Sequence, residues 1–127
     1  MSLSEPFRFR LELRDTIIHA TGSGLCNQYG LVVDLTNAVH QQVISTHSKR
    51  VLVDFQDVDL KLQWADIYNL VKLYEGSMPE FYAIMVGGVF NASGLEFANY
   101  WRDIGKARGF TIQIFPIAKE AETWLLK

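Results

Sequence analysis

Apolar and polar residues alternate strictly over residues 7–14, which is the pattern of a strand with one buried face and one wet face. After the polar pair Asp15-Thr16, residues 16–21 form a second strand-like stretch. We therefore expect a β-hairpin at the start of the chain. The segment Gly22–Gly24 is expected to end it, because glycine is a common strand breaker.

Four later segments have the spacing of amphipathic helices. Their apolar residues fall three or four apart, so each segment has one apolar face: 31–46, 64–74, 93–104 and 117–125. Gly76 with Pro79 marks the end of the second helix, and Gly109 marks the end of the third. Ser93 and Glu96 form a Ser-x-x-Glu pair, which predicts a capping box at the start of the third helix.

Strands between these helices complete the predicted fold. Residues 51–55, apart from Asp54, and residues 81–86 are apolar, which indicates two strands in the middle of a sheet. Residues 110–114 alternate, so this strand and the one at 7–14 belong towards the edges. Helical crossovers favour parallel strands. The prediction is an α/β fold with a mixed five-stranded sheet, built from an N-terminal hairpin plus a parallel β-α-β-α-β unit, and with about four helices mainly on one face.

Length and composition indicate one globular domain over residues 1–127. The chain is 49% hydrophobic and 20% charged, and 127 residues are too few for two cores. The net charge is -2 and basic residues are scattered, so a nucleic-acid partner is not expected. No apolar run approaches the roughly 20 residues of a membrane span. Cys26 has no cysteine partner and residues 1–7 lack a signal-peptide pattern, so we expect a cytoplasmic protein.

Particular segments resemble the SpoIIAA-like branch of the STAS superfamily. The segment Val51–Val58 reads Val-Leu-Val-Asp-Phe-Gln-Asp-Val, an amphipathic helix follows, and the next strand ends near Gly87. The closing segment 114–125 contains Ile-Phe-Pro and then Glu-Ala-Glu-Thr-Trp-Leu. The resemblance extends from Phe7 to the end of the chain and implies a sheet of the STAS or CRAL-TRIO type.

The resemblance also implies two kinds of function. Some STAS domains are anti-sigma-factor antagonists, in which a segment similar to Asp-Ser-Ser-Gly after the central strand holds a phosphorylated serine. The corresponding residues 59–64 here read Asp-Leu-Lys-Leu-Gln-Trp and contain no hydroxyl group to phosphorylate. CRAL-TRIO domains carry lipids in a larger apolar cavity, and this chain is short for such a cavity.

Polar and glycine residues are concentrated where the two central strands are expected to end, and this edge is the candidate binding site. Open α/β sheets bind ligands at the carboxyl ends of their strands. The candidate residues are Asp54, Asp57, Asp59, Gly87, Gly88, Asn91 and Ser93. The carboxylates could hold a divalent cation. We favour the alternative in which Asp57 and Asp59 are turn and cap residues and no metal binds.

Catalytic patterns are weak. Ser93, His19 and Asp54 could be drawn as a triad, but the chain has no Gly-x-Ser-x-Gly segment, and the three histidines have no metal-ligand spacing and are expected on the surface. Cys26 is better explained as a small apolar side chain than as a nucleophile. The three tryptophans lie on apolar helical stripes, which indicates core packing. We predict no catalytic residues, no cofactor and no enzymatic activity.

The sequence therefore favours a non-enzymatic module that binds a small ligand or acts in regulation through a protein partner. The expected ligand is apolar or anionic, and a homo-oligomer stays open. One alternative is a phosphorylation-independent partner protein of the anti-sigma type. Another is a small carrier of lipids or fatty acids. The pathway is not indicated by any residue pattern.

Overall fold

The structure is a computed structural model that describes residues 5–127. Residues 1–4, which begin the segment assessed above for a signal peptide, lie outside the described part. The elements follow one another as expected, with two short 3₁₀ helices added. Their bounds are β1 (Arg8–Arg14), β2 (Ile17–Cys26), α1 (Tyr29–Thr46), β3 (Arg50–Leu60), α2 (Trp64–Ser77), η1 (Pro79–Ala83), β4 (Met85–Phe90), η2 (Ala92–Gly94), α3 (Leu95–Ala107), β5 (Thr111–Phe115) and α4 (Ala118–Leu125).

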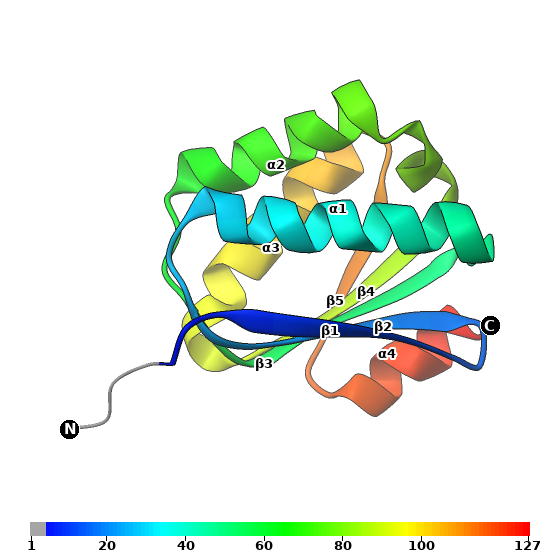
Figure 1. The fold of residues 1–127 in the computed structure, drawn as a ribbon, viewed down its shortest axis with the longest axis horizontal. Helices are drawn as coiled ribbons and strands as arrows, with labels where there is room; N and C mark the ends of the chain where they lie inside the picture. The colour runs from blue at the N-terminus through cyan, green and yellow to red at the C-terminus, as the bar shows by residue number, and fades with distance from the viewer. Residues whose placement is uncertain (1–4) are drawn as a thin grey trace.

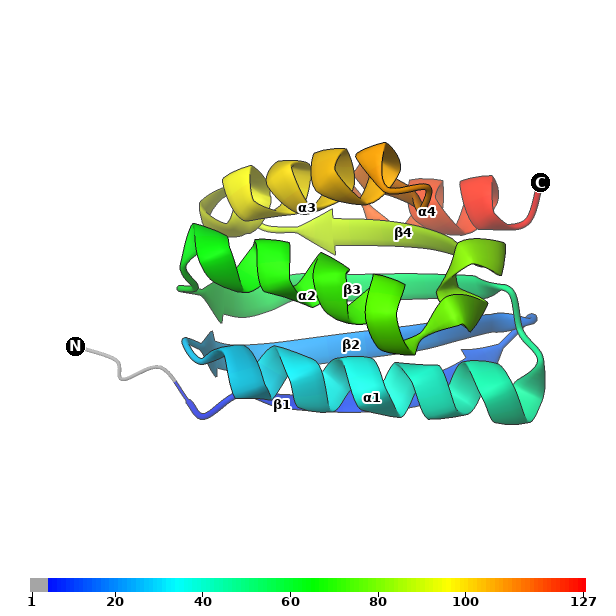
Figure 2. The same ribbon diagram turned by 90° about the horizontal axis from the view of Figure 1, so that it is seen from above.

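The five strands form one sheet in the order β1-β2-β3-β4-β5. The β1–β2 pair is antiparallel, and the other three pairs are parallel. The hairpin, the parallel unit and the placement of β1 and β5 at the edges are confirmed. In Figure 2 the arrowheads of β2, β3 and β4 point to the same side of the molecule, where α1, α2 and α3 begin.

Two apolar layers cover the sheet. Helices α1, α2 and α3 lie on one face and α4 lies on the other, which confirms the prediction of helices mainly on one face (Figure 1). The larger core fills the space beneath α1–α3 and includes Ile18, Val51 and Phe55. The smaller core lies under α4 and is centred on Leu52, Val89 and Leu125. Helix α4 contacts β3, β4 and β5 and also covers Ile17 at the start of β2. The lower face of β1, which carries Arg8, Arg10, Glu12 and Arg14, stays exposed.

Strand boundaries differ from the predicted ones at two glycine-containing segments. Strand β2 continues through Gly22–Gly24 to Cys26, so the predicted stop there is wrong. A Cβ atom on Gly22 would lie 2.9 Å from the Phe55 ring, and the β2–β3 register shifts at this point. Because Gly22 has no side chain, the Phe55 ring can pack directly against the β2 backbone at this bulge.

The predicted strand over residues 81–86 is also displaced. Pro79 begins the 3₁₀ helix η1, which contains Phe81, and β4 starts only at Met85. Gly87 and Gly88 consequently lie inside β4 and not after its end. Proline fixes a backbone angle suited to a first helical turn, and this local preference outweighs the apolar run.

Candidate functional site

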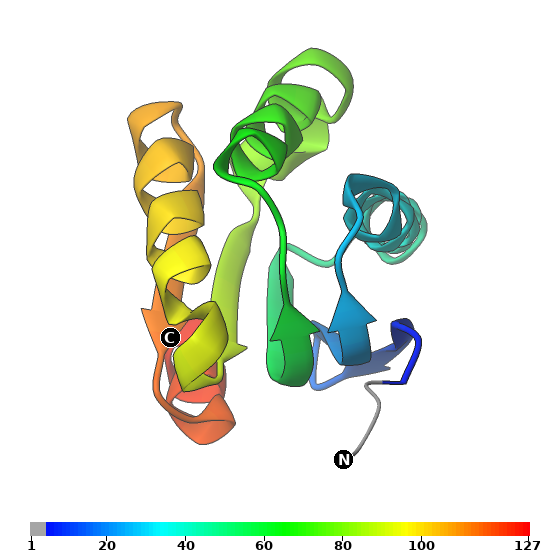
Figure 3. The ribbon, with the colours of Figure 1, turned by 90° about the vertical axis from the view of Figure 1, so that its left-hand side faces the viewer.

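The candidate site is the side of the molecule where the parallel strands end, which we call the carboxyl rim and define as residues 54–66 and 90–100. Figure 3 looks onto this rim, with α2 and α3 rising from it. Strands β3 and β4 are neighbours with Phe55 opposite Phe90. The loops that follow them therefore emerge together, as the sequence predicted.

Asp54 has a partner within its own strand. Its side chain is half-buried, and Oδ1 accepts hydrogen bonds from the backbone N–H and the side-chain Nε2 of Gln56, at 3.1 and 3.0 Å. The expectation that this carboxylate needs a partner in an apolar strand is thus met locally. These two hydrogen bonds lie in the irregular stretch of β3, where the register against β2 shifts.

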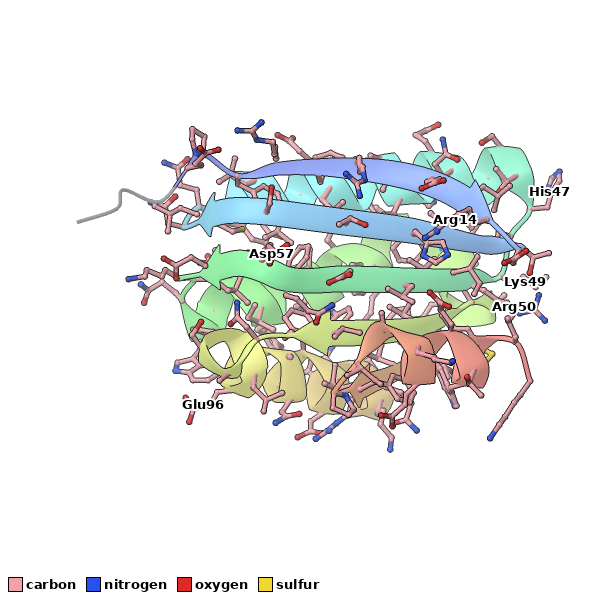
Figure 4. The ribbon with its side chains drawn as sticks, turned by 90° about the horizontal axis from the view of Figure 1, so that it is seen from below. Arg14, His47, Lys49, Arg50, Asp57 and Glu96 are labelled. Atoms are coloured by element: carbon pink, nitrogen blue, oxygen red, sulfur yellow. The ribbon has the colours of Figure 1, made fainter. Side chains whose placement is uncertain are left out.

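Asp57 and Asp59 are strand residues, so their interpretation as turn and cap residues is wrong. Strand β3 runs on to Leu60, five residues beyond the predicted end at Phe55. Val58 and Leu60 are buried under α1–α3, so the alternating aspartates point to the opposite, open face of the sheet. Asp57 is exposed there, as Figure 4 shows from below.

Asn91 joins the ends of β3 and β4. Its Nδ2 donates hydrogen bonds to the backbone carbonyls of Gln56 and Val58, at 3.0 and 2.8 Å. Its Oδ1 accepts from the Gly94 N–H at 3.1 Å and from the Ser93 hydroxyl at 2.7 Å. The whole amide is used inside the fold, which makes Asn91 an organiser of the rim and leaves little of it for a ligand.

The predicted Ser93–Glu96 capping box is wrong. Helix α3 begins at Leu95, and its N-cap residue Gly94 makes no side-chain cap bond. The short helix η2 precedes it, with Asn91 in the capping role. Ser93 is exposed, and its hydroxyl is oriented towards Asn91. The 3₁₀ turn of η2 places the start of α3 at Leu95 and not directly after Ser93. A Ser-x-x-Glu spacing alone does not distinguish these two starts.

Gly87 and Gly88 are buried in the body of β4, away from the rim. A Cβ atom on Gly87 would lie 3.3 Å from the Cβ of Ala121 in α4. On Gly88 it would lie 2.9 Å from the Phe90 ring and 3.2 Å from Ile114. Both glycines therefore bring packed elements close to β4, and tertiary packing accounts for them without a ligand.

The rim also carries an aromatic surface that the sequence reasoning missed. Trp64 is 49% exposed, although its position on a helical stripe predicted a core residue. Its ring packs against Phe97 and Tyr100 of α3, with centroids 4.5 and 5.1 Å apart. We call Trp64, Phe97 and Tyr100 the aromatic ledge. Trp101 is buried and Trp124 half-buried, in line with the expected core packing.

The start of α2 is closed by its own capping box. The Gln63 side chain accepts from the backbone at Asp66, and the Asp66 carboxylate accepts from the Gln63 N–H at 2.9 Å. Gln63 and Asp66 have capping-box spacing, but they are not the serine or threonine and the glutamate or glutamine of the usual motif, so the sequence pattern does not reveal this cap. Residues 59–64 end in this cap and contain no serine or threonine.

The side chains considered for catalysis are separated or occupied. Cys26 is buried at the end of β2, and burial raises the pKa of its thiol to about 11, so the thiol stays protonated. The expectation of a surface position for His19 is wrong: its ring is buried, and Nδ1 accepts a hydrogen bond from Arg14 at 3.1 Å. The Ser93 hydroxyl donates to Asn91, so Ser93, His19 and Asp54 form no hydrogen-bonded chain.

Charge is distributed unevenly between the two ends of the molecule. The segments 54–66 and 91–96 carry five carboxylates and one lysine; the carboxylates belong to Asp54, Asp57, Asp59, Asp66 and Glu96. At the opposite end lie Arg14, His47, Lys49 and Arg50, with Asp15 as an acidic neighbour (Figure 4). The rim is thus an acidic surface with exposed aromatic rings.

Within residues 5–127, no three His, Cys, Asp or Glu side chains are grouped so as to hold a metal ion. The cation-binding interpretation of Asp54, Asp57 and Asp59 therefore has no geometric support. In the same described range, no helix has the length and apolar character needed to cross a membrane.

Comparison with solved structures identifies similar folds. An anti-sigma factor antagonist from Mycobacterium paratuberculosis superposes with a TM-score of 0.66 at 16% identity, over 98% of this chain and 100% of that one. An uncharacterised protein of the DUF3478 family with a SpoIIAA-like fold, from Shewanella loihica, gives a TM-score of 0.60 at 15% identity, over 98% and 97% of the two chains. No protein-family model and no curated protein matches the chain.

Proposed function

We propose that this chain, which has a SpoIIAA-like fold, is a regulatory protein-interaction module whose partner binds the carboxyl rim. The observation that carries the proposal is the half-exposed Trp64, held by Phe97 and Tyr100 on two helices whose first turns carry Asp66 and Glu96. A similar fold is used by an anti-sigma factor antagonist, a protein that acts on another protein.

The aromatic ledge has the properties of a binding hot spot. Hot spots are enriched in tryptophan and tyrosine, because these side chains bury a large area at a small cost in conformational entropy. Trp64 is fixed by ring contacts to two α3 residues, so it is already ordered before a partner arrives. Preordering of this kind lowers the entropic cost of association.

The charges around the ledge indicate the chemistry of the partner. Glu96 is exposed one residue before Phe97, and Asp66 lies in the first turn of α2, two residues after Trp64. Asp57 adds a further negative charge at the same end of the molecule, on the opposite face of the sheet. A partner surface with an apolar side chain for the ledge and with basic residues around it would complement this rim. The partner would therefore be a basic protein surface and not an acidic one.

An anti-sigma-type partner protein that works without phosphorylation is the second candidate. The fold likeness supports it, and so does the lack of a hydroxyl group in residues 59–64. Gln63 and Asp66 already satisfy the first turn of α2, where a phosphorylated side chain would otherwise be held. If the chain has this second function, partner binding depends on the residues of the rim and not on phosphorylation.

A lipid or fatty-acid carrier has less support. The apolar cavity between the sheet and α1–α3 has a volume of about 90 Å³. That is smaller than the engineered cavity of roughly 150 Å³ that holds one benzene molecule. A fatty-acid chain would require the helices to move apart.

Site-directed photo-crosslinking in the native cells tests the proposal. A photoreactive phenylalanine at Ser93, on the rim, is compared with the same residue at Lys49, at the opposite end. We expect a defined protein adduct from position 93 that disappears when Trp64→Ala is added, and no such adduct from position 49. An adduct that survives Trp64→Ala, or equal adducts from both positions, contradicts the proposal.

A further inference from the structure

The cavity under α1, α2 and α3 is a distinct feature of the core. It has a volume of about 90 Å³ between the sheet and the three helices. Val39, Leu70 and Trp101 contribute to its wall from α1, α2 and α3. Val53, Val86 and Ile112 contribute from β3, β4 and β5. Protein cores contain few voids larger than one water molecule, so a space of this size departs from normal packing.

The polar atoms in the wall are already used. Thr36 donates its hydroxyl hydrogen to the Val32 carbonyl at 2.8 Å, and Trp101 donates its indole N–H to the Tyr74 hydroxyl at 3.1 Å. Among the described residues, no buried side-chain nitrogen or oxygen lacks a partner. A buried water needs two to four polar partners, so this wall does not favour water. It favours an uncharged apolar occupant.

The cavity extends towards the carboxyl rim. Leu60, Leu62 and Phe97 belong to its wall, and all three lie where β3 ends and α3 begins. Phe97 is also the ledge residue that packs against Trp64. The cavity wall and the aromatic ledge therefore share Phe97, and displacement of this partly buried ring would open a route into the cavity from the rim.

We propose that this cavity is a binding site for a small, uncharged, apolar molecule of a few heavy atoms, admitted past Phe97. The volume lies between that of a single water and the roughly 150 Å³ of a cavity that binds benzene or xenon. Anions and lipids are excluded, the first by the lack of a polar partner and the second by size. The inference is independent of the proposed protein partner.

Occupation of the cavity would act on the aromatic ledge. The occupant would contact α2 and α3 together, and these two helices carry Trp64 and the other ledge residues. A molecule that binds only the folded state raises stability in proportion to the logarithm of its concentration. Binding of a small apolar compound in the cavity would therefore affect the aromatic ledge at the surface of the protein.

Xenon is the probe that tests the site, because it is a single apolar atom and the volume lies below that of the cavity that binds benzene. In titrations of the full chain followed by NMR, we expect saturable shifts of the Trp101 indole N–H and of the Ile112 methyl groups, and a rise in melting temperature. The absence of saturable shifts with xenon overturns the inference.

Matched variants locate the binding. Ala98 lies in the cavity wall and is buried, so Ala98→Leu places three more carbons in the space and should abolish the xenon shifts. Ala65→Leu makes the same change at an exposed position of α2 and should leave them intact. If Ala98→Leu does not fold, Val39→Ile fills part of the space and should weaken xenon binding at least tenfold. Unchanged binding in the folded cavity variant shows that xenon binds elsewhere and overturns the inference.

Discussion

At the scale of single residues, the Asn91 side chain supplies the hydrogen-bond donors that a neighbouring strand would otherwise provide to the end of β3. The pairing of β3 with β4 ends at Phe55 and Phe90, while β3 itself continues to Leu60. The carbonyls of Gln56 and Val58 would then lack partners on that side, and the Asn91 amide supplies two donors to them. Backbone groups that lose a partner in a partly buried site cost free energy, so this amide stabilises the rim.

Replacement of Asn91 by alanine should lower the free energy of unfolding by about 1–3 kcal/mol, because the carbonyls of Gln56 and Val58 lose their donors. The Gly94 N–H keeps its hydrogen bond to the backbone carbonyl of residue 91. Asn91→Asp keeps the acceptor oxygen but loses both donors, so it should be destabilised as well. Ser93→Ala serves as the control, with a change within about 0.5 kcal/mol at an exposed site. Urea unfolding measures all three. Equal stability of Asn91→Ala and Ser93→Ala would contradict this role.

His19 makes stability depend on pH. Burial, followed by the Arg14 cation, lowers the pKa of His19 below its ordinary value of 6.5, while the carboxylates of Glu122, Glu12 and Asp15 act in the opposite direction. The unfolded chain therefore binds a proton at higher pH than the folded chain does. By linkage, this contribution to stability is complete above about pH 7.5 and is lost as the pH falls through 6.5 towards the lower folded value.

His19→Asn should reduce this pH dependence, since the amide has no proton to take up and its oxygen can still accept from Arg14. The measurement is the free energy of unfolding between pH 5 and pH 8 for both proteins. We expect a shallower slope between about pH 5.5 and pH 7 in the variant. Parallel curves over that interval would show that another group carries the effect.

At the scale of elements, two glycines lie in opposite environments: the space around Gly24 is crowded, and the space around Gly76 is open. Gly24 has a φ of 94° in β2, and a Cβ atom there would collide with the backbone carbonyl of Pro6. The Leu25 N–H donates to the Glu5 carbonyl at 2.7 Å, so this contact attaches the N-terminal segment to the sheet. Gly76 lies near the end of α2, with open space around it.

Alanine at these two positions should have effects of opposite sign. Gly24→Ala should destabilise the fold by about 1–3 kcal/mol from its backbone angle alone, with the Pro6 collision in addition. Gly76→Ala should stabilise it by about 0.5–1 kcal/mol, because alanine is the better helix former and meets no neighbour. Thermal and urea unfolding distinguish the two. Stabilisation by Gly24→Ala would mean that the strand passes this point in another conformation.

Helices were easier to predict than strand ends, and the reason is physical. A helical stripe such as that of α2 repeats over several turns, so many residues support the same assignment. The displaced strand at residues 81–86 had only six residues, and an apolar run of that length does not separate a buried strand from a buried 3₁₀ turn. The glycines of β4 misled the prediction further, because packing against α4 requires them.

At the scale of the whole molecule, the acidic rim and the basic opposite end give the protein an electrical polarity (Figure 4). Strand β3 carries three of the rim's five carboxylates near its carboxyl end, and the first turns of α2 and α3 carry the other two. Lys49 and Arg50 lie at the other end, where β3 begins. A basic partner approaching the rim would be steered by this field at low salt.

Reversal of the rim charges should slow association with the partner. The double variant Asp57→Lys, Glu96→Lys should reduce the association rate constant about tenfold or more at low salt, with a smaller effect at high salt because of screening. Lys49→Glu changes one charge at the distant end and should have little effect. Surface plasmon resonance with the crosslinked partner provides the rates. A faster association of the double variant would indicate an acidic partner.

The sequence alone determined the element order, the mixed sheet and the strands at its edges, because hydrophobic period and crossover geometry are properties of short segments. Tertiary structure alone decided that Trp64 is exposed, that Asp57 faces the open side of β3 and that Gly87 is enclosed. Each of these depends on where a neighbouring element ends. Residue spacing gives the face of a helix or strand, but only the assembled fold shows whether another element covers that face.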